Sequence, residues 1–256
     1  MLFRSIAAGA AAAATAVAAH RALSKLPEPF PNPQPGPAFE PQPMPDLPEP
    51  VAAYLHTVAP DLPVMRSAVT IGRFTMRLGR LQVPGRWRFT HEVGRGYRHE
   101  MDITALGRRV ARGDERYLDG HAELDLPGGV TSGPKIDAAA HLSMWGEYVW
   151  LPSVLATAQW EEIDAVSARM RVPGSDQPLL AWFDPQTHLL TRFETLRWRG
   201  ADDPEPLPWA TTNLAWTRIS GIGVPAVATV QWGDQKQPWL RMSLDDAVWN
   251  VPVDLR

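Results

Sequence analysis

The clearest cluster of side chains that could do chemistry is the run His121-Ala122-Glu123-Leu124-Asp125. Alternate residues of an extended strand share a face, so His121, Glu123 and Asp125 would lie together, opposite Ala122 and Leu124. An imidazole and two carboxylates on one surface could hold a divalent cation or act as acid and base. Because the same alternation is typical of the solvent side of a half-buried strand, we favour a solvated face and predict no resident metal.

Glu147 is the carboxylate with the most unusual sequence surroundings, because it lies amid Trp145, Tyr148 and Trp150. Burial beside aromatic rings would raise its pKa and make a functional acid conceivable. The alternative is structural: Glu147 caps the loop at Pro152 or pairs with an arginine from the sheet.

The remaining motifs do not predict catalysis. In His99-Glu100-Met101-Asp102, the two carboxylates share a face opposite the histidine. No serine lies in a G-x-S-x-G elbow, and Gly128–Lys135 imitates a phosphate loop but has Pro134 where the lysine should follow the second glycine. We therefore predict no catalytic residue and no cofactor.

Composition bounds the class of protein. The 256 residues carry 25 Lys+Arg and 28 Asp+Glu, a net charge of -3, and 45% are hydrophobic. That balance indicates a globular chain and argues against a disordered protein, a general nucleic-acid binder or a multi-span membrane protein. The absence of cysteine excludes disulfides and a thiol nucleophile.

Positive charge is concentrated early in the chain. Residues 66–116 hold 12 arginines and 5 acidic residues, a net charge of +7. If Arg66, Arg73, Arg77, Arg86 and Arg88 share one outer surface, they could attract an anionic membrane surface or an acidic partner. The alternative is that they pair with the acidic second half of the chain.

The first 50 residues look like a targeting segment and a tether. Residues 1–25 have a basic start, an alanine-rich run and a small-x-small site at Ala16-Val17-Ala18, which predicts an export signal, or else an N-terminal membrane anchor. Residues 26–49 are rich in proline and predict an extended polyproline II linker, which would act as a stiff spacer or remain as an inert tail. The localisation that follows is extracytoplasmic.

Residues 50–256 predict one mainly β domain. A helix should begin at Pro50, because Val51, Tyr54, Leu55 and Val58 fall on one stripe. Strict alternation predicts strands around 73–78, with Phe74, Met76 and Leu78 on one face, and around 86–89. Seven later strands separated by turn residues are expected at 159–163, 167–172, 179–183, 189–198, 209–219, 224–232 and 238–249.

A second helix is predicted over 137–149, with Asp137 as its N-cap and Leu142, Trp145 and Val149 on one stripe. Short connections between strands indicate antiparallel neighbours. The predicted architecture is therefore a single curved antiparallel sheet, a half-barrel, with one or two covering helices.

Several motifs carry a resemblance to known families. The run Phe183–Leu190, followed by Gly221-Ile222-Gly223-Val224-Pro225, resembles the second half of the outer-membrane lipoprotein-sorting fold. Residues 47–256 resemble a bacterial family of unknown function, through Tyr117-Leu118-Asp119-Gly120 and Gly146-Glu147-x-x-Trp150-x-Pro152-Ser153. The resemblance implies a half-barrel whose helical lid closes an apolar cavity. A short, polar segment at 127–136, with its Gly128-Gly129 pair, departs from the expected pattern and leaves the size of the cavity open.

We therefore expect an exported, non-enzymatic domain that binds a lipid-like or other apolar small molecule against a tryptophan-lined concave face, without nucleic acid. The helix around Trp145–Trp150 would be the lid. The alternatives are an envelope interaction module with a packed core and, third, a metal-dependent or acid/base hydrolase. The candidate ligand-binding residues are Trp87, Phe89, Trp145, Glu147, Trp150, Trp182, Phe193 and Trp232.

Overall fold

The computed structural model describes residues 25–79 and 81–256. Apart from Lys25, the predicted export segment lies outside the described residues. Within the described part of the chain, no helix is both long and apolar enough to cross a membrane.

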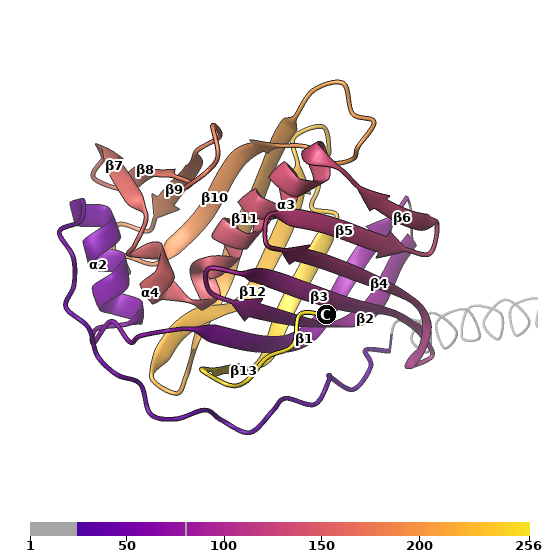
Figure 1. Ribbon diagram of the computed structural model, residues 1–256, viewed down its shortest axis with the longest axis horizontal. Coiled ribbons are helices and arrows are strands. Elements are labelled where there is room, and N and C mark those ends of the chain that lie inside the picture. The colour runs from indigo at the N-terminus through magenta and orange to yellow at the C-terminus, as the bar shows by residue number, and fades with distance from the viewer. Residues whose placement is uncertain (1–24, 80) are drawn as a thin grey trace, which may run out of the picture.

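The described residues form one 13-stranded antiparallel sheet, which confirms the predicted fold class (Figure 1). The order across the sheet is β6-β5-β4-β3-β2-β1-β13-β12-β11-β10-β9-β8-β7. The strands span β1 Ser67–Leu78, β2 Leu81–Glu92, β3 Gly96–Ala105, β4 Arg108–Leu118, β5 His121–Leu126, β6 Gly129–Ser132, β7 Gln159–Asp164, β8 Ser167–Arg171, β9 Leu179–Phe183, β10 Leu190–Arg197, β11 Leu207–Ile219, β12 Ile222–Trp232 and β13 Leu240–Trp249. The predicted strands after residue 159 all form, with bounds shifted by at most two residues.

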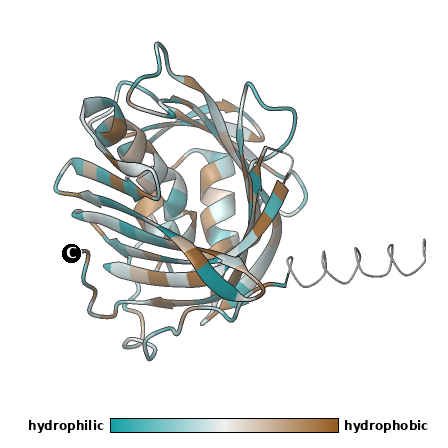
Figure 2. Cartoon of the chain, turned by 90° about the vertical axis from the view of Figure 1, so that its right-hand side faces the viewer, coloured by the Kyte–Doolittle hydropathy of each residue, from teal (hydrophilic) through white to brown (hydrophobic). Residues whose placement is uncertain are grey.

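The order explains how the sheet surrounds its own helices. Strands β1 and β13 pair in the middle of the sheet, from Ala68↔Trp249 to Met76↔Leu240, so β6 and β7 become the two edges. The chain between these edges forms α3 Pro134–Glu147, the 3-10 helix η1 Tyr148–Trp150 and α4 Pro152–Leu155. This helical segment joins one edge to the other on the concave side, where Leu142, Trp145 and Trp150 belong to the same buried core as Trp87 of β2. Figure 2 shows a helix inside the curved sheet.

Helix α2, Glu49–Val58, confirms the prediction of a helix at Pro50, and its predicted apolar stripe is buried. The prediction for α3 was wrong about its start. The helix begins at Pro134, whose fixed φ suits a first turn, and Asp137 lies inside that turn rather than capping it. The Asp137 carboxylate instead accepts the backbone N–H of Ala122 at 2.6 Å, which fastens α3 to β5.

Alternation along the first strands places residues as predicted. Phe74 on β1, and Trp87 and Phe89 on β2, are buried, whereas Arg73 and Arg86 lie on the outer face. Gly72 makes room for this packing: a Cβ atom there would lie 2.7 Å from the Trp87 ring. The Trp87 indole N–H also donates to the carbonyl of Arg73 at 3.2 Å, which fixes its ring across β1.

Three of the five arginines predicted for the outer surface pair with carboxylates among the described residues. Arg86 Nε lies 2.9 Å from Asp102, and Arg73 Nε lies 2.9 Å from Asp245. Arg66 contacts Glu40 at 3.3 Å. Of these three partners, only Asp245 belongs to the acidic second half of the chain, so the predicted pairing with that half is right for Arg73 alone. Asp102 lies on the neighbouring strand β3, and Glu40 lies in the proline-rich segment.

The proline-rich segment is extended, as predicted, but it packs on the domain and does not stand away from it as a spacer (Figure 1). Phe30 is buried, with the Arg86 guanidinium 4.1 Å from its ring centroid. Phe39 lies against Trp249, with the ring centroids 6.0 Å apart. A Cβ atom on Gly36 would lie 2.2 Å from the carbonyl oxygen of Trp249, so the chain approaches β13 more closely than a side chain allows.

This docking predicts a measurable contribution to stability. Replacing Phe30 with alanine should lower the free energy of unfolding by about 2 kcal/mol, somewhat below the range of about 3–5 kcal/mol typical of phenylalanines in protein cores. Urea unfolding of the two proteins gives the difference. Gln34→Ala, at an exposed position of the same segment, is the control and should be neutral. Equal stability of the Phe30→Ala variant and the parent would contradict a docked segment.

Candidate ligand cavity and its histidine–glutamate network

A cavity of about 520 Å³ lies on the concave side of the sheet, between the first and the second half of the strand order. This volume falls within the range of about 300–1,000 Å³ that is usual for small-molecule sites. One wall consists of inward residues of β3 and β5, including Met101, Ile103 and Leu124. The other includes Met76 of β1 and Trp232 of β12. The apolar character of the lining follows from strand alternation, which directs every second residue inward.

A few polar groups also line the cavity. His99 of β3 and Glu115 of β4 are neighbours in register and face it side by side. Arg77, Arg197 and Arg199 line it as well. The site therefore has the composition of a ligand pocket: mostly apolar walls with a small number of placed polar groups.

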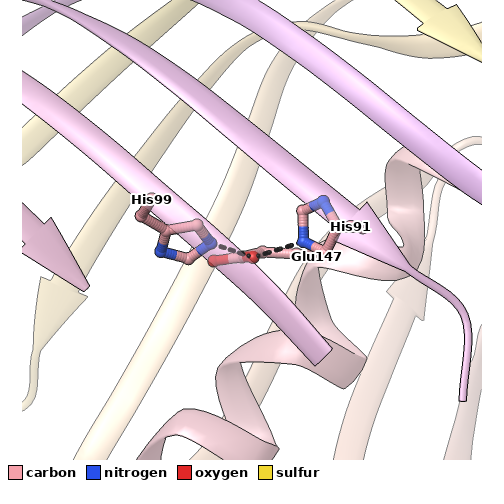
Figure 3. A group of neighbouring side chains, drawn as sticks. All are labelled: His91, His99 and Glu147. Atoms are coloured by element: carbon pink, nitrogen blue, oxygen red, sulfur yellow. Dashed lines mark hydrogen bonds and ion pairs between the residues drawn. The ribbon is translucent and has the colours of Figure 1, made fainter. Parts of the chain in front are cut away.

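Behind the cavity, His99 belongs to a buried network with His91, Glu115 and Glu147. Figure 3 shows His91 and His99 on either side of the Glu147 carboxylate. The ring nitrogens Nε2 of His91 and His99 lie 2.9 and 2.8 Å from the same Oε2 atom of Glu147. His99 Nδ1 lies 3.8 Å from Glu115 Oε2, and the Tyr97 hydroxyl donates to the other oxygen of Glu115. The four side chains come from β2, β3, β4 and the last residue of α3, so the network ties the helix to the sheet.

The electrostatics of the network favour a charged His99. Burial works to lower the pKa of His99, but the charges and hydrogen bonds of Glu147 and Glu115 outweigh it and raise that pKa to about 9. Burial likewise works to raise the pKa of Glu147, but the charge of His99 and the hydrogen bonds from both histidines lower that pKa to about 2. For His91, burial dominates and lowers the pKa. At neutral pH the network therefore holds one imidazolium between two carboxylates.

The same atoms form a set that could hold a metal ion. The ligating atoms of His91, His99 and Glu147 lie within 4.8 Å of one another, and two imidazoles with a carboxylate are a set that zinc uses in proteins. Protons and metal ions compete for imidazole lone pairs. A cation bound by His99 Nε2 would therefore have to displace the proton that lies between this nitrogen and Glu147.

The structure places most of the predicted tryptophan and phenylalanine residues in a solid core. Trp87 and Trp150 stack with ring centroids 5.4 Å apart, and Phe89 lies 4.8 Å from Trp87. Trp145 and Phe193 are also buried in this core. Among the eight predicted site residues, only Trp232 lines the cavity. The cavity walls are instead mainly methionine, leucine and isoleucine side chains, together with Trp239.

The prediction for Trp182 was wrong in its direction. The buried residues of β9 are Leu179, Ala181 and Phe183, so Trp182 lies on the opposite face of the strand and is only half-buried. Successive residues of a strand point to opposite faces, so burying Leu179, Ala181 and Phe183 places the Trp182 side chain on the other face of β9.

Among the residues that the structure describes, Glu147 neither pairs with an arginine nor caps the loop at Pro152. It pairs with His91 and His99, which lie on two different strands, β2 and β3. The His121, Glu123 and Asp125 cluster does share a face, and that face is solvated: the His121 side chain is 87% exposed, and its carboxylate neighbour is Asp137 at 3.7 Å.

The polar residues of the network and the cavity that the sequence analysis did not single out include His91, Glu115 and Arg197. His91 follows Trp87 and Phe89 on the inward face of β2, and Arg197 follows Phe193 and Thr195 on the inward face of β10. The signal was available: a titratable side chain at an inward position of an otherwise apolar strand face requires a partner.

Comparison with solved structures finds similar folds at low identity. A LolA superfamily protein from Nitrosomonas europaea is 10% identical, with a TM-score of 0.49 over 79% of this chain and 93% of that chain. A DUF1329 family protein from Desulfovibrio piger is 9% identical, with a TM-score of 0.48 over 80% and 93%. LprF from Mycobacterium bovis is 13% identical, with a TM-score of 0.30 over 81% and 96%. A LolA superfamily protein is thus among the similar structures, and its TM-score below 0.5 carries no argument about the ligand or activity of this chain.

No curated protein matches this sequence. A family model does match, over residues 37–242, which span nearly the whole sheet and its helices. The prediction of a family of unknown function is therefore confirmed, and the chain belongs to DUF6544, a family of unknown function.

Proposed function

We propose that this protein binds the apolar chain of a lipid-like small molecule in the cavity of its half-barrel, as a binding protein and not as an enzyme. The observation that carries the proposal is the apolar cavity of about 520 Å³, walled by side chains such as Met101, Ile103 and Leu124. Moving an apolar chain from water into such a site is favourable by about 0.8 kcal/mol for each buried methylene. We further propose that the site works outside the cytoplasm, on the basis of the signal-like residues 1–25.

The fixed position of the helices supports a preformed cavity. The helix around Trp145–Trp150, the expected lid, comprises the end of α3 and η1. Hydrogen bonds of Asp137 and Glu147 join α3 to the sheet, and the Trp249 indole donates to the carbonyl of Trp150 in η1 at 2.8 Å. None of the described residues that line the cavity belongs to α3, η1 or α4, so we propose that the cavity exists without a movement of these helices.

Uptake can be measured with N-phenyl-1-naphthylamine, a neutral apolar dye whose fluorescence rises in an apolar site. We expect the parent protein to bind the dye, and the Ile103→Trp variant, which narrows the cavity, to bind it at least tenfold more weakly. The matched control is Ile163→Trp, because Ile163 is an exposed isoleucine on the edge strand β7. Native mass spectrometry of protein purified without detergent should show a co-purifying lipid.

The packed tryptophan core favours the alternative of an envelope interaction module. That alternative predicts no dye uptake by the parent, or equal uptake by the parent and Ile103→Trp. Either result would overturn the proposed binding function.

A further inference from the structure

Arg197 is an arginine on the inward face of a core strand. On β10 the buried residues Phe193 and Thr195 alternate with outward residues such as Leu196, and Arg197 continues the inward series into the cavity. Charged side chains are rarely placed on such a face unless a partner compensates them.

The guanidinium is held in place but only partly paired. Arg197 Nε donates to the Ala139 carbonyl of α3 at 2.9 Å. Its Cζ atom lies 5.1 Å from the Trp209 ring centroid and 5.4 Å from that of Trp232, so two aromatic faces flank it. Within the described part of the chain, the two terminal nitrogens of Arg197 have no hydrogen-bond or ion-pair partner. They remain available as two parallel donors.

Two of the other charged groups of the cavity, Arg199 and Glu115, lie close to groups of opposite charge. Arg199 pairs with Asp234 at 2.8 Å. Glu115, the one carboxylate among the described lining residues, is contacted by Tyr97 and His99, and it is close enough to Arg197 for the two charges to interact without an ion pair within 4.0 Å. Arg77 donates to the neutral amide oxygen of Gln237. Among the described lining residues, Arg77 and Arg197 thus have no carboxylate within 4.0 Å, and the cavity carries an excess of positive charge.

We propose that the ligand is an anionic single-chain amphiphile; this inference rests on the proposed function. The two terminal nitrogens of Arg197 bind its carboxylate or phosphate head, and its chain lies along the wall formed by Met101 and Leu124. The planar guanidinium matches both heads through two parallel hydrogen bonds. The volume of about 520 Å³ suits one chain of small-molecule size.

The test displaces N-phenyl-1-naphthylamine with three competitors that share one chain: hexadecanoate, hexadecyl phosphate and methyl hexadecanoate. We expect the parent to prefer at least one anionic competitor over the neutral ester by tenfold or more, and the better anion identifies the head. In Arg197→Gln the preference should disappear while the affinity for the ester is kept. In Arg197→Lys, which keeps the positive charge but lacks the planar guanidinium, the preference for the anionic competitor should fall only in part.

Arg192→Gln is the control, because Arg192 lies on the outer face of the same strand and pairs with Glu194 at 2.7 Å. This variant should keep the full preference. Thermal unfolding of each variant verifies that it is folded. Equal affinity of the parent for all three competitors, or an undiminished preference in folded Arg197→Gln, overturns the assignment of Arg197 but leaves apolar binding in place. Failure of the parent to bind the dye and the neutral ester overturns the proposed function instead.

Discussion

Replacement of Glu147 by glutamine is expected to lower the free energy of unfolding by about 3 kcal/mol, at the lower end of the cost of removing one partner from a buried ion pair. Glutamine keeps the shape of the side chain but removes the charge that two histidines share. The Glu147 side chain is only 16% exposed, so water replaces little of the lost interaction. Urea unfolding at pH 6.5 measures the change.

Glu123→Gln is the matched control, because Glu123 is an exposed glutamate on β5. It should change stability by less than about 0.5 kcal/mol, as surface substitutions usually do. A double variant, Glu147→Gln with His99→Gln, should cost less than the sum of the two single changes, because the two residues interact directly. Additive effects, or an unchanged stability of Glu147→Gln, would show that the network contributes nothing to folding.

The stability of the metal-free protein should depend on pH with a maximum near pH 6.5. On the alkaline side, His99 has a pKa of about 9 in the folded state, above its ordinary value of 6.5. Its contribution is therefore complete below pH 6.5 and is lost as the pH rises toward 9. A shift of that size corresponds to about 3 kcal/mol.

On the acid side, two groups act in the same direction. Glu147 has a folded pKa of about 2, so its contribution is present above pH 4.5 and is lost as the pH falls toward 2. His91 has a lowered folded pKa, so acid favours the unfolded state, in which this histidine can take up a proton.

Chemical denaturation across pH 3–9.5 tests both limbs, with EDTA present to remove metal ions. In His99→Gln the alkaline loss between pH 6.5 and 9 should be largely absent, whereas in the exposed His121→Gln it should remain. A parent protein that gains stability from pH 6.5 to 9 would contradict a charged His99.

Local patterns in the sequence determined the strands and their faces. Alternation is a property of the extended backbone, so Phe74, Trp87 and Phe89 could be assigned to the inward side before any partner strand was known. The apolar stripe of Val51, Tyr54 and Leu55 determined helix α2 in the same way. Short turns predicted antiparallel neighbours, and the sheet has them throughout.

Which inward residues line the cavity and which pack in the core depends on the three-dimensional arrangement of the strands and helices. Trp87 and Trp150 are far apart in the chain and become a stacked pair only because the α3 segment crosses the concave side. That crossing follows from the pairing of β1 with β13, which leaves β6 and β7 as the edges. The local sequence pattern does not predict the pairing of β1 with β13, because these strands lie at opposite ends of the domain sequence.

The buried network shows the same division. The sequence placed Glu147 among aromatic residues and His99 opposite its acidic neighbours, and both placements are correct. The contacts join residues 56 and 48 positions apart in the chain, His91 and His99 each with Glu147. Periodicity assigns a side chain to a face, whereas the partner on that face depends on strand register and on where the helix ends. For this reason the sequence pattern predicts a half-barrel with an apolar interior, whereas the contacts of His91 and His99 with Glu147, and of His99 with Glu115, depend on how the chain folds.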